Sequence, residues 1–117
     1  MIVITKDAVD PKTMYERIGK SEAGSILLHY AVVKGQAGER ASAGIHFERA
    51  GEVESELSAI EADIKERWNV EDVLLVRRID TLEIGDVISL IAVSSPTSQD
   101  AFDACRHGLE RMKRMKT

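Results

Sequence analysis

The sequence predicts an α+β fold in which helices pack on a largely antiparallel sheet. Two observations support this class: strand-like and helical segments alternate along the chain, and hairpin-type connections dominate over crossovers. The predicted order of elements is βαββαββα. A chain of 117 residues is the size of one domain and can bury a core without a metal or a disulfide. Because there is no internal repeat or linker, we expect a single domain over residues 1–117.

The first part of the chain predicts two strands and one helix. Residues 2–5 form a short strand-like run. Asp10 followed by Pro11 is typical of a helix start, because proline fits the first helical position, and the helix should reach about Lys20. Residues 25–34 are almost continuously apolar, which predicts a strand buried on both faces.

The middle of the chain predicts a loop, a strand and a long helix. Two glycines in residues 35–40 favour a loop, which is a candidate for the edge of a functional site. Residues 42–48 alternate apolar and polar side chains, as a half-exposed strand does, and should pair antiparallel with the strand before them. Residues 52–68 have the spacing of an amphipathic helix. Its apolar residues are Val53, Leu57, Ile60, Ile64 and Trp68.

The last part predicts two apolar strands, over residues 73–76 and 87–93, joined through a turn at Gly85 and Asp86. A helix should follow over about residues 98–115, because Thr97 with Asp100 suits a capping box. Its apolar face is predicted to hold Phe102, Cys105, Leu109 and Met112.

Composition restricts the function. The net charge of −4 argues against general nucleic-acid binding. No apolar run approaches the roughly 20 residues that span a bilayer, and the first residues lack the pattern of a secretory signal, so we expect a cytoplasmic protein. The single cysteine, Cys105, fits a reducing compartment. We expect a buried structural thiol; the alternative, a reactive thiol, needs a partly exposed electropositive setting.

The common nucleotide, metal and hydrolase motifs are missing from the sequence, and His29, His46 and His107 lack metal-ligand spacing. We therefore predict no metal and no cofactor. The basic residues of the last helix are Arg106, His107, Arg111, Lys113, Arg114 and Lys116. They could simply complement the helix dipole, or they could form an anion site.

Lys34 could join such a site, because it stands at the end of the predicted strand and the start of the glycine loop. Arg77 and Arg78 should face opposite sides of their strand, and a charge after a buried strand is more often a solvated end.

The ordered set of local features resembles the large subunit of molybdopterin synthase over about residues 24–113. The matching features are the strand ending at Lys34, the pairs Arg67 and Trp68, Arg78 and Ile79, Gly85 and Asp86, Ala101 and Phe102, and Lys113. This resemblance implies an α/β hammerhead-like fold.

The resemblance also implies a sulfurtransferase of molybdenum cofactor biosynthesis that converts cyclic pyranopterin monophosphate into molybdopterin. Its sulfur arrives as a thiocarboxylate on the Gly-Gly tail of a small ubiquitin-like partner subunit. Two large subunits form a homodimer within a heterotetramer. Basic residues suit this chemistry, since the phosphate, the thiocarboxylate and the developing oxyanion are all negative.

Carried over residue by residue, Lys113 matches the catalytic lysine of the family. Lys34 stands where the family has arginine, so the charge is kept but the bidentate fork is lost. Arg78 matches a recurrent arginine with either a structural or a pocket-lining role. Lys116 could take the place of a second lysine, which the family carries in a C-terminal Pro-Phe-Trp-Lys-like run beyond the last residue here.

The sequence departs from the family at Thr97 and Ser98, where the family contributes a histidine and an arginine across the dimer. Two functions remain open. The first is a working synthase subunit with a rearranged pocket. The second is a non-catalytic homologue that acts as a dimeric binding or regulatory module for a Gly-Gly-tailed protein.

Overall fold

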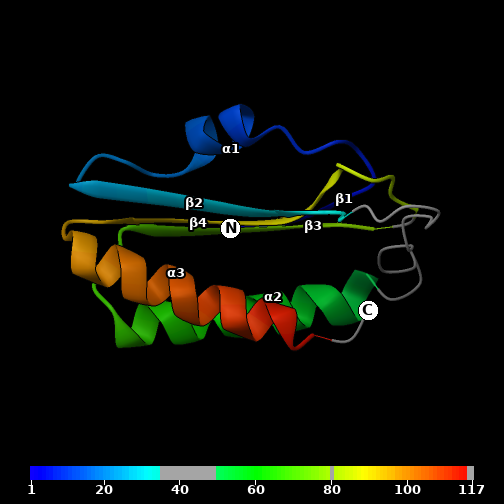
Figure 1. Ribbon diagram of the computed structural model, residues 1–117. Helices are drawn as coiled ribbons and strands as arrows, with labels where there is room; N and C mark the ends of the chain where they lie inside the picture. The colour runs from blue at the N-terminus through cyan, green and yellow to red at the C-terminus, as the bar shows by residue number, and fades with distance from the viewer. Residues whose placement is uncertain (35–49, 80, 116–117) are drawn as a thin grey trace.

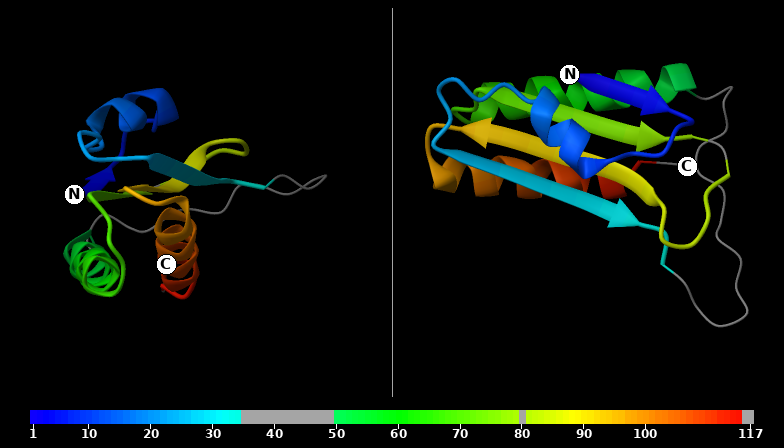
Figure 2. Two further views of the ribbon diagram at one scale, coloured as in Figure 1. Left: turned by 90° about the vertical axis from the view of Figure 1, so that its left-hand side faces the viewer. Right: turned by 90° about the horizontal axis from the view of Figure 1, so that it is seen from above.

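The computed structural model describes residues 1–34, 50–79 and 81–115. Helices α2 and α3 lie side by side on one face of a sheet, and α1 lies on the other face (Figures 1 and 2). The elements are β1 (Ile2–Thr5), α1 (Pro11–Arg17), β2 (Ser25–Val32), α2 (Ala50–Arg67), β3 (Asp72–Arg78), β4 (Val87–Ser95) and α3 (Ser98–Lys113). The predicted α+β class is confirmed.

The predicted loop over residues 35–40 and the predicted strand over residues 42–48, which includes His46, lie outside the described residues. Within the described part of the chain the order is therefore βαβαββα, without the third strand of the prediction. None of the helices described there is long and apolar enough to span a membrane.

The sheet has the strand order β1-β3-β4-β2. β1 runs parallel to β3, whereas β3 with β4 and β4 with β2 are antiparallel pairs, so the largely antiparallel prediction is confirmed. Residues 73–76 and 90–93 are 1% exposed or less. The two central strands are apolar without alternation because one set of side chains faces α2 and α3 and the other set faces α1.

Strand β2 is less buried than its apolar sequence predicts. Tyr30 and Val32 are 48% and 47% exposed, so the prediction of burial on both faces is wrong. The reason is position: among the described strands, β2 comes last in the sheet order and pairs with β4 alone.

The amphipathic prediction for α2 is confirmed. Its stripe of Val53, Leu57, Ile60 and Ile64 is at most 1% exposed and packs in one cluster with the inner faces of β3, β4 and α3. Trp68 is partly buried at the margin of this cluster.

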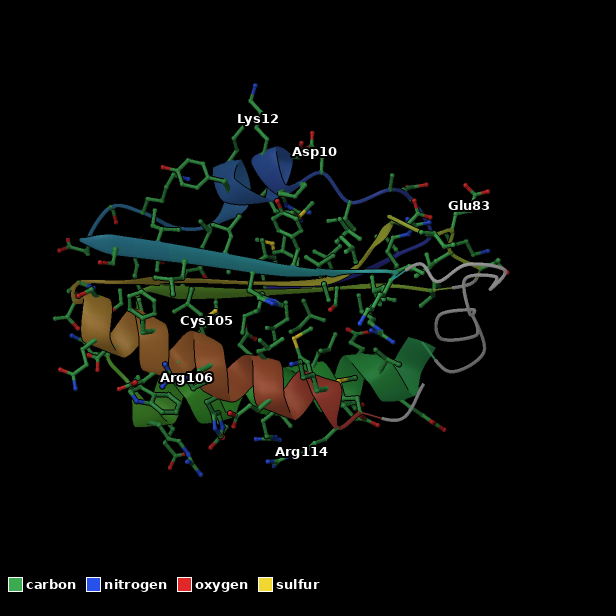
Figure 3. All side chains as sticks on the ribbon, in the orientation of Figure 1. Asp10, Lys12, Glu83, Cys105, Arg106 and Arg114 are labelled. Carbon is green, nitrogen blue, oxygen red and sulfur yellow. The ribbon has the colours of Figure 1, made fainter. Side chains whose placement is uncertain are left out.

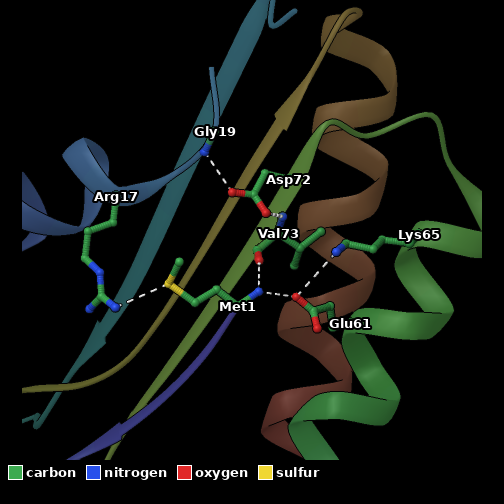
Figure 4. A network of polar contacts seen from close by, with 7 residues as sticks. All are labelled: Met1, Arg17, Gly19, Glu61, Lys65, Asp72 and Val73. Atoms are coloured by element: carbon green, nitrogen blue, oxygen red, sulfur yellow. Dashed lines mark hydrogen bonds and ion pairs between the residues drawn. The ribbon is translucent and has the colours of Figure 1, made fainter. Parts of the chain in front are cut away.

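Polar contacts fasten the start of the chain to the centre of the fold (Figure 4). The ammonium group of Met1 donates to the carbonyl oxygen of Val73 at 2.7 Å and also contacts the carboxylate of Glu61. The carboxylate of Asp72 accepts from the backbone N–H of Gly19 at 2.7 Å. β1 and the segment after α1 are thus tied to β3 and α2.

Helix α1 starts as predicted, because the side chain of Asp10 accepts from the backbone N–H of Lys12 at 3.0 Å. It ends at Arg17 rather than near Lys20. The ammonium group of Lys20 instead donates to the carbonyl oxygens of Tyr15 and Ile18, both at 2.9 Å, and so satisfies acceptors that the end of the helix leaves free.

Helix α3 begins as predicted, with the Thr97 hydroxyl accepting from the backbone N–H of Asp100 at 3.3 Å, and ends at Lys113, two residues early. The prediction that Phe102 lies on the buried face is wrong, since it is 55% exposed. The residues that face the core are Ala101, Ala104, Cys105, Gly108 and Met112. Phe102 follows Ala101 by about 100° around the helix and so points outward.

Cys105 lies between α3 and the sheet, whereas Arg106 projects away from it (Figure 3). The side chain of Cys105 is buried, with the residue 6% exposed, and desolvation raises the pKa of its thiol to about 11. Thiolate is therefore scarce at neutral pH, as expected for a structural thiol.

Gly108 lets α3 approach the sheet closely. A Cβ atom at this position would lie 2.3 Å from Cδ1 of Ile91 and 2.9 Å from Cδ1 of Ile64. We expect Gly108→Val to lower the free energy of unfolding by about 1–3 kcal/mol through overpacking, measured by urea denaturation. Arg106→Val, on the exposed side of the same helix, is the control and should cost less than about 1 kcal/mol. Equal effects of both substitutions would contradict the packing argument.

Alkylation of Cys105 should report global opening. At pH 8, iodoacetamide should label the native protein about 100-fold more slowly than the urea-unfolded protein, because both burial and the raised pKa reduce attack by the thiolate. Mass spectrometry measures the rate. A native protein that reacts as fast as the unfolded one would show an accessible thiol.

Candidate functional site

One end of the molecule gathers the residues that the sequence nominated. The C-terminal ends of β2, β3 and α3 lie there together (Figures 1 and 2). Lys34 follows β2 and Lys113 ends α3, and both are exposed. The two lysines therefore lie at the same end of the molecule, although they are 79 positions apart in sequence. Lys116 lies outside the described residues.

The basic helix is partly neutralised. Asp63 of α2 forms a hydrogen bond with Nε2 of His107 at 2.5 Å and ion pairs with Arg67 at 2.9 Å and Arg111 at 3.0 Å. The hydrogen bond with His107, together with Arg67, lowers the pKa of the Asp63 carboxyl, although its partial desolvation acts in the opposite direction. The ring of Trp68 packs at 5.1 Å from the ring of His107. This cluster fastens α2 to α3.

The end of α3 keeps its charge. Arg106 pairs loosely with Asp103 at 3.9 Å, and Arg111 is engaged by Asp63. Within the described residues, neither Lys113 nor the side chain of Arg114 has a hydrogen bond or an ion pair. Free positive charge therefore concentrates in the last turn, where the helix dipole favours cations and an anionic ligand would find unused donors.

Two hollows border α3. The first, of about 270 Å³, lies between α2 and α3 and is lined by Glu56, Ala59, Ile60, Arg111, Arg114 and Met115. The second, of about 300 Å³, lies between β2 and α3 and is lined by Leu27, Leu28, His29, Phe102, Cys105, Arg106 and Leu109. Neither of these two hollows includes Lys34 or Lys113, so neither places the two lysines in a common cleft.

Arg77 and Arg78 face opposite sides of β3, as predicted, but neither is a freely solvated strand end. Arg78 is 8% exposed, and its guanidinium donates to the carbonyl oxygen of Lys6 at 3.0 Å and lies 4.0 Å from the carboxylate of Asp86. These contacts tie the segment after β1 to the β3–β4 turn. Of the two roles left open for Arg78, structural or pocket-lining, these contacts favour the structural role.

Arg77 is the residue that sequence reasoning missed. Alternation along β3 puts it on the same face as Leu75 and Ile79, which pack with α2 and α3. It lies opposite Ser89 of β4 in the register, and Ser89 is buried. The sequence did contain a signal for this position: Arg77 is an even number of residues from Val73 and Leu75, so its charged side chain points to the same face of the strand as these apolar ones.

Thr97 and Ser98 lie at the other end of α3. A helix of 16 residues is about 24 Å long. A side chain at the start of α3 therefore cannot reach Lys113 of the same chain, and only a second copy could bring the two positions together. Among the described residues, no three His, Cys, Asp or Glu side chains are grouped so that they could hold a metal ion.

Comparison with known proteins gives matches over nearly the whole chain. The family model described as MoaE protein matches residues 4–115. The molybdopterin synthase catalytic subunit of Bacillus subtilis (strain 168) is 28% identical over 113 residues, which are 96% of this chain and 72% of that protein.

Solved structures share the fold. A crystal structure of molybdopterin synthase from Staphylococcus aureus has a TM-score of 0.78 at 27% identity and covers 97% of this chain and 82% of its own. The complex of subunits 1 and 2 of molybdopterin-converting factor from Helicobacter pylori 26695 has a TM-score of 0.71 and covers 96% of this chain and 77% of its own. At 12% identity, the second likeness shows the fold alone. Since the family model spans nearly every described element, from β1 to the end of α3, this chain belongs to the MoaE protein family.

Proposed function

We propose that this chain is the catalytic subunit of a molybdopterin synthase, a sulfurtransferase that converts cyclic pyranopterin monophosphate into molybdopterin. The observation that carries the proposal is the position of Lys113. It matches the family's catalytic lysine, ends α3 without an ion-pair partner among the described residues, and lies at the same end of the molecule as Lys34.

The sulfur donor in this proposal is a thiocarboxylate on the C-terminal Gly-Gly tail of a small ubiquitin-like subunit. The fold shared with the complex of subunits 1 and 2 of molybdopterin-converting factor from Helicobacter pylori 26695 supports association with a second chain. The ammonium group of Lys113 contacts the thiocarboxylate carbon or the substrate intermediate, and Lys34 and Lys116 bind anionic oxygens. A preorganised cation is worth most where charge develops and water is scarce. The reaction needs neither a metal nor a cofactor in this chain.

The assembly we propose is a homodimer of this chain within a heterotetramer in the cytoplasm. The length of α3 supports a dimeric site, because the start of one helix can meet Lys113 only in another copy. Thr97 and Ser98 then supply hydroxyl groups where the family supplies two basic side chains. The pocket therefore lacks at least the charge of the arginine, which is always a cation.

That loss favours a second candidate function, in which the chain keeps the fold and the grip on a Gly-Gly tail but does not catalyse sulfur transfer. Such a homologue would act as a binding or regulatory module. Reconstitution separates the two functions, since both predict binding of the small subunit and only the first predicts product.

Substitution of the lysine tests the catalytic role. We expect Lys113→Ala to lower molybdopterin formation by at least about 100-fold, the size of effect seen when one preorganised group that stabilises developing charge is removed. The assay combines the chain, the thiocarboxylated small subunit and cyclic pyranopterin monophosphate. Arg106→Ala, an exposed cation on the same helix, is the matched control and should retain activity. Unchanged turnover of Lys113→Ala would remove this lysine from the mechanism.

Binding of the small subunit is a separate prediction. Isothermal titration calorimetry should detect micromolar or tighter binding of a small Gly-Gly-ended protein, and Lys34→Ala should weaken it about tenfold, because one charge-assisted contact is worth about 1.5–3 kcal/mol. Higher salt should reduce the difference, since the contact is exposed. Absence of binding would count against both candidate functions.

A further inference from the structure

Arg77 is a half-buried cation for which the described residues provide no counter-charge. Its Nε atom is buried and has no hydrogen-bond partner, and the described residues provide neither a hydrogen bond nor an ion pair for the rest of its guanidinium. Desolvation by the surrounding protein lowers the pKa of the Arg77 guanidinium below its ordinary value. Nε of the adjacent Arg78 is also buried and without a partner, but the rest of that guanidinium has the carbonyl oxygen of Lys6 and the carboxylate of Asp86 as partners.

The position of Arg77 connects it with the proposed active site. Leu75 and Ile79, two residues before and after it, belong to the same core cluster as Met112 of the last turn of α3. Arg77 therefore lies on the strand face that packs against α2 and α3. The end of β3 also lies at the end of the molecule where β2 leads into Lys34 (Figure 1).

The neighbour of Arg77 on β4 adds a second polar group. Ser89 lies directly opposite in the antiparallel register, so its hydroxyl shares the helix-facing side of the sheet with the guanidinium. Ser89 is 8% exposed, in a region whose other inward residues are apolar. A guanidinium fork and a hydroxyl are the donors that bind the paired oxygens of a carboxylate or a phosphate.

We propose that Arg77, assisted by Ser89, is the inner anchor for an anionic oxygen group of the ligand that reaches Lys113. This inference rests on the proposed function and deepens it, because it assigns a third cation to that end of the molecule. The anchored group is either the phosphate of the substrate or the carboxylate end of the Gly-Gly tail. A buried charge without a partner is costly to a folded protein, and an anion that binds there removes this cost.

The site is well suited to strong electrostatics. The Nε atom of Arg77 is buried, and the strand face on which Arg77 lies also carries the buried Leu75 and Ile79. An anion placed at the guanidinium therefore interacts in a lower dielectric than at the exposed lysines. Lys34 and Lys113 would then attract and position the ligand from solvent, and Arg77 would hold its charged end.

The test uses the full chain and its Arg77→Met variant, which keeps length and apolar character but has no charge. The two probes are inorganic pyrophosphate and a synthetic tail peptide that ends in Gly-Gly with a free carboxylate. Affinity is measured by isothermal titration calorimetry and thermal stability by scanning calorimetry. We expect Arg77→Met to bind at least one probe more than tenfold more weakly than wild type, and Arg106→Met to bind both probes as wild type does.

Thermal stability without ligand gives an independent readout. Arg77→Met should melt at the same temperature as wild type or higher, because it removes an uncompensated charge, whereas Arg78→Met should melt lower, because it leaves the carbonyl oxygen of Lys6 and the carboxylate of Asp86 without their donor. A clear loss of stability in Arg77→Met would show a structural role for Arg77 and overturn the proposal.

The two probes distinguish the source of the anion. Loss of pyrophosphate binding alone assigns Arg77 to the phosphate of the substrate. Loss of binding of the free-carboxylate peptide assigns Arg77 to the carboxylate of the tail, provided that the amidated peptide already binds wild type weakly. If both probes bind Arg77→Met as tightly as wild type, or if neither binds wild type, the anchor does not exist.

A conservative variant covers the case in which Arg77→Met does not fold. Arg77→Lys keeps the charge and loses the fork, and we expect severalfold weaker binding of the probe; unchanged binding would overturn the bidentate role. Failure of the proposed function has a different signature. In that case binding of the probes depends on Arg77, but reconstitution with the thiocarboxylated small subunit and the pterin yields no molybdopterin.

Discussion

The burial of β3 and β4 on both faces is the constraint on which the rest of the structure depends. Every other described element packs against this pair: β1 and β2 extend it on either side, α1 covers one face, and α2 with α3 cover the other. The backbone groups of the two strands are satisfied by the sheet, which leaves their apolar side chains free to fill two separate clusters. α3 can lie close to this surface because Gly108 has no side chain where it meets Ile91.

This arrangement determines where charge can accumulate. Acidic and basic groups on α2 and α3 neutralise one another around Asp63, which lies near the end of α2 and contacts Arg67, His107 and Arg111. The end of α3 extends past that cluster, and its last cations have no partner among the described residues. Because β2 and β3 end at the same place, positive charge from three elements gathers at one end of a protein that is acidic as a whole. An anionic substrate and an anionic tail would be drawn to this end rather than to the rest of the surface.

Much of the fold could be predicted from local patterns. The stripe of α2, the caps at Asp10 and Thr97 and the turn at Gly85 follow from residue spacing and side-chain chemistry, and the structure confirms them. The errors concern burial. The apolar run over residues 25–34 predicts burial on both faces, but Tyr30 and Val32 are exposed, and Phe102 is predicted inside but points outward, because residue type does not specify which neighbours an element acquires.

The sequence alone determined the α+β class, the starts of α1 and α3, and the resemblance that nominated Lys113 and Lys34, since these depend on short-range periodicity and on residue identity. Only the tertiary structure decided that the two lysines lie at one end, that Arg78 is held by Lys6 and Asp86, and that Arg77 is half-buried with no partner among the described residues. The physical reason is that the cost and the use of a charge depend on the groups around it, and strand order and helix docking bring those groups together from distant parts of the chain.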